Sequence, residues 1–189
     1  MILEIQRSGI SDSAVLEAMK IVPVHKFEEG MSEDERCFSA VSVVQLAEML
    51  ISLDLKADEK VLHLKTCTGY EAALLSKLAR AVVTVGLSPR FAERVKKIYS
   101  ELSYESITVI LSDPSIGWEK EAPYDKILIT CSLDEVPSSL FDQLKEGGRL
   151  VGLKRSDEHG VELSIIVFDK KNGRVEEITG RDAGDSGEK

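Results

Sequence analysis

The sequence lacks the cysteine and histidine spacings that mark disulfide frameworks and metal sites. Its 189 residues contain three cysteines, Cys37, Cys67 and Cys131, without a Cys-x-x-Cys pair, and three histidines that lie far apart. An odd number of widely spaced cysteines argues against a disulfide framework, and scattered histidines do not supply a ligand set for zinc. We therefore expect reduced thiols, no metal and a cytoplasmic protein.

Long apolar runs and basic clusters are also absent. No apolar run approaches the roughly 20 residues that a membrane-spanning helix needs, and Glu4 and Arg7 interrupt the start of the chain, where a signal peptide would have its apolar core. The formal net charge is -9, with no Lys/Arg cluster to offset it, so a phosphate backbone would be repelled. We expect neither a membrane nor a nucleic acid as a partner, while the oligomeric state stays open.

The apolar residues that are present suit a single domain. They make up 43% of the chain, which is enough for one core without help from metals or disulfides. Val15, Leu16 and Met19 recur at helical spacing after the capping residues around Asp12, and a second apolar stripe runs from Val43 to Ile51. These patterns predict a segment of helices over residues 1–58, followed by an α/β core over residues 59–179.

Strands alternate with helices from residue 60 onward. The predicted strands are Val61–Leu64, Val82–Val85, Ile107–Leu111, Ile127–Thr130 and Leu150–Leu153, and the predicted helices are Tyr70–Ala79, one that begins at Ser88-Pro89, and Val136–Lys145. This order predicts a doubly wound, mostly parallel sheet with right-handed crossovers.

The end of the chain has a different pattern. Val161–Asp169 and Arg174–Ile178 flank Asn172-Gly173, which suits a two-residue primed turn and predicts an antiparallel hairpin at the C-terminal edge of the sheet. Residues 180–189 carry no apolar side chain larger than alanine, so we expect them to form a disordered acidic tail.

Two stretches carry a family resemblance. Residues 112–152 contain an aspartate, then Gly-Trp, then Ala-Pro-Tyr-Asp, then Pro-x-x-Leu-x-x-Gln-Leu-Lys-x-Gly-Gly-Arg-Leu-Val, and the N-terminal part contains "GISDSAVLEAMKIVPVHKF". In this order, over roughly residues 8–155, the chain resembles the protein-L-isoaspartate O-methyltransferase family, a branch of the S-adenosylmethionine-dependent methyltransferases. The resemblance implies a single-domain Rossmann-like fold, S-adenosylmethionine as cofactor and isoaspartyl residues of damaged proteins or peptides as substrate.

The resemblance also assigns site residues, which would follow the carboxyl ends of the strands. The family's cofactor loop resembles Glu-x-Gly-x-Gly-x-Gly, its second strand ends in an acidic ribose acceptor, and its third strand leads to an adenine contact. The corresponding residues here are His63, Lys65, Cys67 and Gly69 for the loop, Gly86 for the ribose acceptor and Asp113 for the adenine contact.

Several of these positions depart from the family pattern. A Cys67 side chain directed at the cofactor would occupy its volume, and Gly86 supplies no carboxylate. The loss of a charged acceptor costs about 1.5 to 3 kcal/mol, or one to two decades in affinity. We therefore expect weak or lost cofactor binding.

The substrate side departs as well. Ser39 aligns with the family's catalytic-site serine, but the segment between Phe27 and Ser39 is shorter than in the family and lacks its Gly-x-Gly-Gln-Thr-Ile-Ser sequence. Five carboxylates in this segment would oppose an anionic substrate. Ser39 has a second interpretation as the N-cap of the helix that follows.

Three functional hypotheses remain at this point. The first is a non-catalytic binding protein that keeps the fold, a pseudoenzyme; the second is an active carboxyl methyltransferase; the third is a binder of another anionic ligand through His63 and Lys65. Each site residue also has a structural alternative: a hydrogen-bonded strand-end histidine for His63, a solvated lysine for Lys65, simple packing for Cys67 and a turn cap for Asp113.

Overall fold

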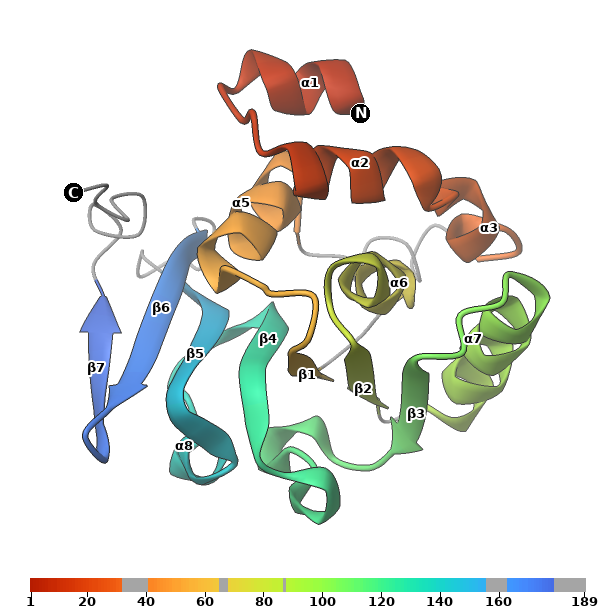
Figure 1. The fold of residues 1–189 in the computed structure, drawn as a ribbon. Helices are drawn as coiled ribbons and strands as arrows, with labels where there is room; N and C mark the ends of the chain where they lie inside the picture. Colours follow the sequence, from red (N-terminus) through yellow and green to blue (C-terminus); the bar gives the residue numbers. More distant parts are fainter. Residues whose placement is uncertain (32–40, 65–67, 87, 156–162, 179–189) are drawn as a thin grey trace.

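One seven-stranded sheet organises the molecule (Figure 1). The computed structural model describes residues 1–31, 41–64, 68–86, 88–155 and 163–178, so the predicted tail at 180–189 lies outside the described residues. The strands follow the order β3-β2-β1-β4-β5-β6-β7 across the sheet. Their bounds are β1 Lys60–Leu64, β2 Ala81–Gly86, β3 Ile107–Leu111, β4 Tyr124–Leu133, β5 Leu144–Arg155, β6 Leu163–Lys171 and β7 Arg174–Ile178.

The strand directions confirm the predicted fold class. The five strands β1 to β5 are parallel to one another. Strand β6 is antiparallel to β5, and β7 is antiparallel to β6. Asn172 and Gly173, with φ of 55° and 70°, form the tight turn between β6 and β7, as a primed hairpin turn requires. The outermost strand, β7, exposes Arg174, Glu176 and Glu177.

Several helices begin at a side chain that caps the first turn. The helices of the described residues are α1 Ile2–Arg7, α2 Ser13–Ile21, α3 Val24–Glu28, α5 Val43–Leu53, α6 Tyr70–Leu78, α7 Pro89–Glu101 and α8 Ser138–Asp142. The Asp12 carboxylate accepts from the Val15 amide at 2.9 Å, and the Ser88 hydroxyl accepts from the Phe91 amide at 3.3 Å ahead of Pro89. Both predicted caps are confirmed. The cap of α5 is Ser42, not Ser39, and Ser39 itself lies outside the described residues.

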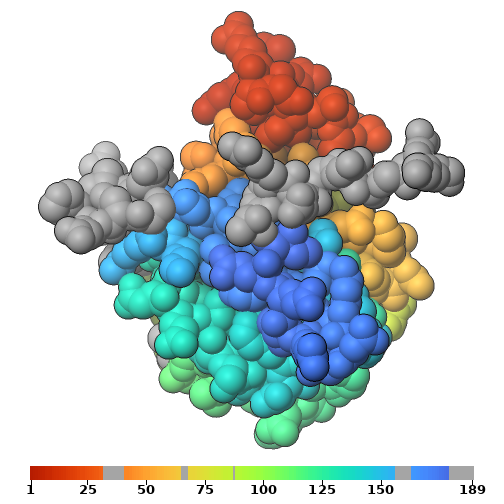
Figure 2. Space-filling model, turned by 90° about the vertical axis from the view of Figure 1, so that its left-hand side faces the viewer, coloured from red at the N-terminus to blue at the C-terminus, as the bar shows by residue number. Residues whose placement is uncertain are grey.

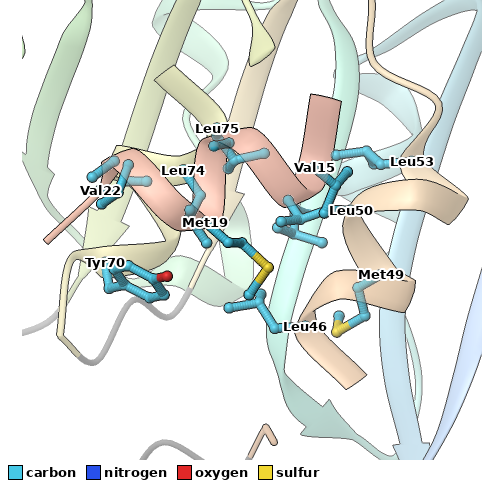
Figure 3. Close-up of a cluster of buried hydrophobic side chains, with 14 of the residues drawn as sticks. Val15, Met19, Val22, Leu46, Met49, Leu50, Leu53, Tyr70, Leu74 and Leu75 are labelled. Carbon is cyan, nitrogen blue, oxygen red and sulfur yellow. The ribbon is translucent and has the colours of Figure 1, made fainter. Parts of the chain in front are cut away.

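The core lies mostly on one face of the sheet. Helix α2 crosses over α5 and α6 and packs Val15 and Met19 against Leu46, Leu50 and their neighbours (Figure 3). Buried residues of α1, α3 and α7 belong to the same apolar cluster as β1, β2 and β5. On the opposite face, a second cluster packs β1, β2, β4 and β5 against the short helix α8. Figure 2 views the molecule from the side of β6 and β7, with the N-terminal helices above these strands.

The structure corrects some predicted elements. The short helices α1 and α3 were not expected. The helix predicted over Val136–Lys145 is shorter in the structure and spans Ser138–Asp142. Leu144 instead begins β5, where it pairs with Tyr124 and is buried. Among the described residues, no helix is both long enough and apolar enough to cross a membrane.

Candidate functional site

The carboxyl ends of four parallel strands meet at one edge of the sheet. In the register of the sheet, His63 pairs with Thr84, and Gly86 pairs with Leu111 at the ends of β2 and β3. Loops that follow such ends form the ligand crevice of open α/β sheets. His63, Gly69, Gly86 and Asp113 all lie at or directly after this edge, whereas Ser39, Lys65 and Cys67 lie outside the described residues.

Gly69 begins helix α6 with a left-handed backbone, at φ 87° and ψ −7°. A Cβ atom here would lie 2.7 Å from Val95 Cγ1 and 2.8 Å from Tyr99 Oη, which is closer than packed atoms approach. Tyr99 Oη also donates a hydrogen bond of 2.7 Å to the Gly69 carbonyl. Gly69 is therefore required both by its own conformation and by the packing of α7 against the first turn of α6.

The first turn of α6 contains a buried carboxyl group that sequence reasoning missed. The Thr68 hydroxyl accepts from the Tyr70 amide at 3.1 Å and donates to Glu71 Oε2 at 3.3 Å. Burial raises the pKa of Glu71 above its usual value, which favours the neutral acid. Glu71 therefore lies at the N-terminus of α6, where helix geometry favours negative charge, in surroundings that disfavour its own ionisation.

His63 is completely buried within the sheet. Its Nδ1 lies 3.1 Å from Thr84 Oγ1 on β2, and its Nε2 lies 3.0 Å from Thr130 Oγ1 on β4. Burial lowers the pKa of His63 from 6.5 to about 3, so the ring is neutral at physiological pH. The imidazole therefore joins three central strands just below the crevice, with both ring nitrogens engaged inside the sheet.

The threonine partners of His63 could have been found from the sequence. Thr84 and Thr130 are polar residues in the otherwise apolar stretches "VVTVG" and "ILIT". A buried polar residue needs a hydrogen-bond partner, and the three residues share one face of neighbouring strands. What the sequence did not contain was the register that brings them together.

Gly86 and Asp113 lie on neighbouring chain segments at the ends of β2 and β3. The Gly86 carbonyl accepts from the Ser112 amide at 3.1 Å, so the pairing of β2 with the β3 segment continues to the residue directly before Asp113. Asp113 is exposed, and its Oδ1 accepts from the amide and the hydroxyl of Ser115, at 2.8 and 2.7 Å. The turn-cap alternative for Asp113 is thus realised.

Two large apolar side chains are exposed beside Asp113. Leu111 is 51% exposed at the end of β3, and Ile116 is 58% exposed in the short 3-10 helix η1, Pro114–Ile116. An exposed apolar pair beside a carboxylate suits a flat ring that carries polar edge groups, because the ring covers the apolar surface and the carboxylate accepts from its edge. The described residues contain no cluster of His, Cys, Asp and Glu that could hold a metal.

This sheet order, with its crevice at the carboxyl edge, defines a class of protein: the Rossmann-like methyltransferases. A solved protein-L-isoaspartate O-methyltransferase superimposes with a TM-score of 0.76 at 24% identity, over 92% of this chain and 60% of that chain. The chain thus spans about 60% of that structure's length. A second, from Plasmodium falciparum in complex with S-adenosyl-L-homocysteine, gives a TM-score of 0.72 at 18% identity, over 94% of this chain and 92% of that chain.

Within this class, the chain belongs to the protein-L-isoaspartate(D-aspartate) O-methyltransferase family, whose model matches residues 1–179. The protein-L-isoaspartate O-methyltransferase 1 of Syntrophobacter fumaroxidans is 40% identical over 155 residues, which cover 76% of this chain and 72% of the relative. The protein-L-isoaspartate O-methyltransferase of Methanoculleus marisnigri is 34% identical over 185 residues, which cover 93% and 83%.

These relatives overturn the hypothesis of a non-catalytic pseudoenzyme. Proteins named as isoaspartyl methyltransferases share 33 to 40% identity with this chain over most of its length, which supports the active-enzyme alternative. The physical error lay in treating a weakened contact as a lost site. The loss of one charged acceptor costs about one to two decades of affinity, which would weaken a cofactor site without abolishing it.

Proposed function

We propose that this protein is an S-adenosylmethionine-dependent carboxyl methyltransferase that acts on isoaspartyl residues of damaged proteins. The observation that carries the proposal is the family match over residues 1–179, together with relatives that bear this activity in their names at up to 40% identity. The crevice geometry is consistent with this activity, because its glycine turn, helix terminus and carboxylate all lie on one edge of the sheet.

The described residues fit the proposed cofactor. Gly69 and the first turn of α6 would face the cofactor's carboxylate, where helix N-termini favour negative charge. Asp113 would accept from the adenine edge, and the exposed Leu111 and Ile116 would cover its ring. When bound, the cofactor supplies an electrophilic methyl group on a sulfonium. Lys65 and Cys67 remain proposed members of the same loop.

The protein's own contribution to the reaction is positioning. A substrate carboxylate is already ionised at neutral pH, so its oxygen can attack a methyl group without a general base. The products are a methyl ester and S-adenosylhomocysteine. Alignment of nucleophile and methyl group then supplies most of the rate. Ser39 is the proposed substrate contact. His63 is neutral and both of its ring nitrogens contact threonine hydroxyls, so we assign it no proton transfer in this step.

A methyl-transfer assay tests the proposal. The chain is incubated with methyl-labelled S-adenosylmethionine and a peptide that contains one isoaspartyl residue, with the same peptide containing a normal aspartyl residue as the matched control. We expect base-labile label on the isoaspartyl peptide alone. Cofactor binding without ester formation would refute the isoaspartyl substrate, and the absence of both would refute the methyltransferase assignment.

A further inference from the structure

The segment between β3 and β4 carries Asp113 to the crevice, but it has few backbone partners of its own. It contains η1 and a second 3-10 helix, η2, Glu119–Glu121. Short helices of this kind leave backbone groups unpaired at both ends, and buried unpaired groups are costly. The position of Asp113 therefore depends on which side chains hold this segment.

The side chain of Gln143, at the end of α8, forms hydrogen bonds to this segment. Its Oε1 accepts from the Trp118 amide at 2.8 Å, and its Nε2 donates to the Ile116 carbonyl at 2.7 Å and to the Ser139 carbonyl at 3.1 Å. The side chain is only 4% exposed. One carboxamide thus uses both of its ends and links the Asp113 segment to helix α8.

The segment is shaped to fit this carboxamide. Gly117 has φ of 70°, and a Cβ atom there would lie 2.5 Å from Gln143 Oε1 and 2.7 Å from Nε2. Tyr124, which is fully buried, donates from its hydroxyl to the Trp118 carbonyl at 2.7 Å and from its amide to the Gln143 carbonyl at 2.8 Å. Both backbone groups of Trp118 are therefore fixed by buried side chains.

We propose that Gln143 is a positioning residue of the cofactor site: by clamping Ile116 and Trp118, it holds η1, and hence Asp113 and the exposed Ile116, in place beside the crevice. The inference rests on the proposed function, since it assumes that a nucleoside occupies this edge. Gln143 lies 30 residues after Asp113 in the sequence and acts on the ligand only through the segment that it holds.

The chain offers a matched control for a purely structural role. Lys170 on β6 donates to the carbonyls of Phe141 and Leu144 at 2.8 and 2.9 Å, at the same junction of α8 and β5. Loss of this lysine removes two hydrogen bonds at the junction but does not touch the Asp113 segment. Lys170→Met therefore reproduces the loss of junction stability without the loss of positioning.

Calorimetric binding of S-adenosylhomocysteine to the full chain is the first measurement. We expect Gln143→Met to weaken binding by about 10-fold, because the segment must then be ordered at the expense of binding energy, and Lys170→Met to leave binding within about 2-fold. Tyr124→Phe, which removes only the Trp118 bond, is the milder variant and should weaken binding by a few fold. Equal affinities for the Gln143→Met and wild-type proteins would overturn the proposal.

A double-mutant cycle with Asp113→Ala separates positioning from general destabilisation. If Gln143 acts through the segment that carries Asp113, the loss in the double variant is clearly smaller than the sum of the two single losses, and fully additive losses would overturn the inference. In the assay, KM for the cofactor should rise in Gln143→Met, while kcat at saturation and KM for the peptide stay unchanged. Failure of the wild-type chain to bind would instead refute the proposed function.

Discussion

Gly86 is the residue at which this chain departs most clearly from the cofactor pattern of the family that it resembles. It ends β2 beside Leu111, at the position where the family resemblance implies a ribose-binding carboxylate. It is an extended residue of β2, and this is a backbone conformation that residues other than glycine also adopt. If the proposed cofactor binds at this edge, the absence of a carboxylate at this residue leaves the ribose hydroxyls without a charged acceptor.

At this residue the prediction is a gain of affinity. Gly86→Glu restores the missing acceptor and should tighten S-adenosylhomocysteine binding by about 10- to 100-fold, the equivalent of about 1.5 to 3 kcal/mol. Gly86→Gln is the control, since it has nearly the same volume and no charge. Titration calorimetry on both variants measures the difference. Equal binding by the two variants would show that the ribose does not lie beside this residue.

Single residues also show what the sequence could not predict. Gln143 belongs to the stretch that carries the family resemblance, yet its partners Ile116 and Trp118 lie more than twenty residues away in the sequence, and only the folded β4–β5 connection brings them together. His63 lies near the end of β1 as the sequence predicted, but its hydrogen bonds depend on the register of three strands. Local patterns do not contain such contacts.

At the scale of elements, helix α7 contacts the start of α6 closely at Gly69. Gly69 combines a left-handed backbone with contacts to Val95 and Tyr99 that leave no space for a methyl group. Gly147 provides a natural comparison, because its φ of 76° is similar but nothing lies within 4 Å of an added Cβ. An alanine at Gly147 therefore tests the free-energy cost of the left-handed backbone alone, and an alanine at Gly69 tests that cost together with the cost of overpacking.

This comparison gives a prediction about stability. Gly147→Ala should lower the free energy of unfolding by about 1 kcal/mol, the cost of the left-handed conformation. Gly69→Ala should lower it by about 3 kcal/mol, because overpacking against α7 adds to the same conformational cost. Urea unfolding of both variants provides the measurement. Similar losses would mean that α7 moves aside freely.

Elements differ in how well the sequence predicts them. The five parallel strands, the hairpin and the caps at Asp12 and Ser88 followed from apolar patterns and turn residues, because these signals are local. Helix α1 was missed because six residues are too few to distinguish helical from strand periodicity. Helix α8 was overestimated because burial of Leu144 in the sheet outweighs helix propensity.

At the scale of the whole molecule, His63 couples stability to pH. Its pKa is about 3 in the folded protein and 6.5 when unfolded, so between these values only the unfolded chain takes up the proton. The stabilisation is fully present above pH 6.5 and is lost as the pH falls toward 3, by about 1.4 kcal/mol per pH unit. Glu71, whose pKa is raised by burial, acts in the opposite direction.

A comparison of the wild-type protein with His63→Gln isolates the contribution of this histidine to the pH dependence of stability. Between pH 7 and pH 5, the free energy of unfolding of the wild-type protein should fall by about 2 kcal/mol more than that of His63→Gln, since glutamine does not titrate and Glu71 is common to both. Urea denaturation at several pH values measures these slopes. Parallel slopes would show that the folded sheet accepts a proton on this ring.

The charged outer strand β7 has a consequence for a protein proposed to handle damaged chains. Partly unfolded polypeptides expose backbone groups that can extend any open sheet, and a repair enzyme meets them at every turnover. The edge strand β7 carries exposed, charged side chains of both signs at Arg174, Glu176 and Glu177. If the proposed function holds, we expect these charges to oppose the pairing of a substrate chain with β7.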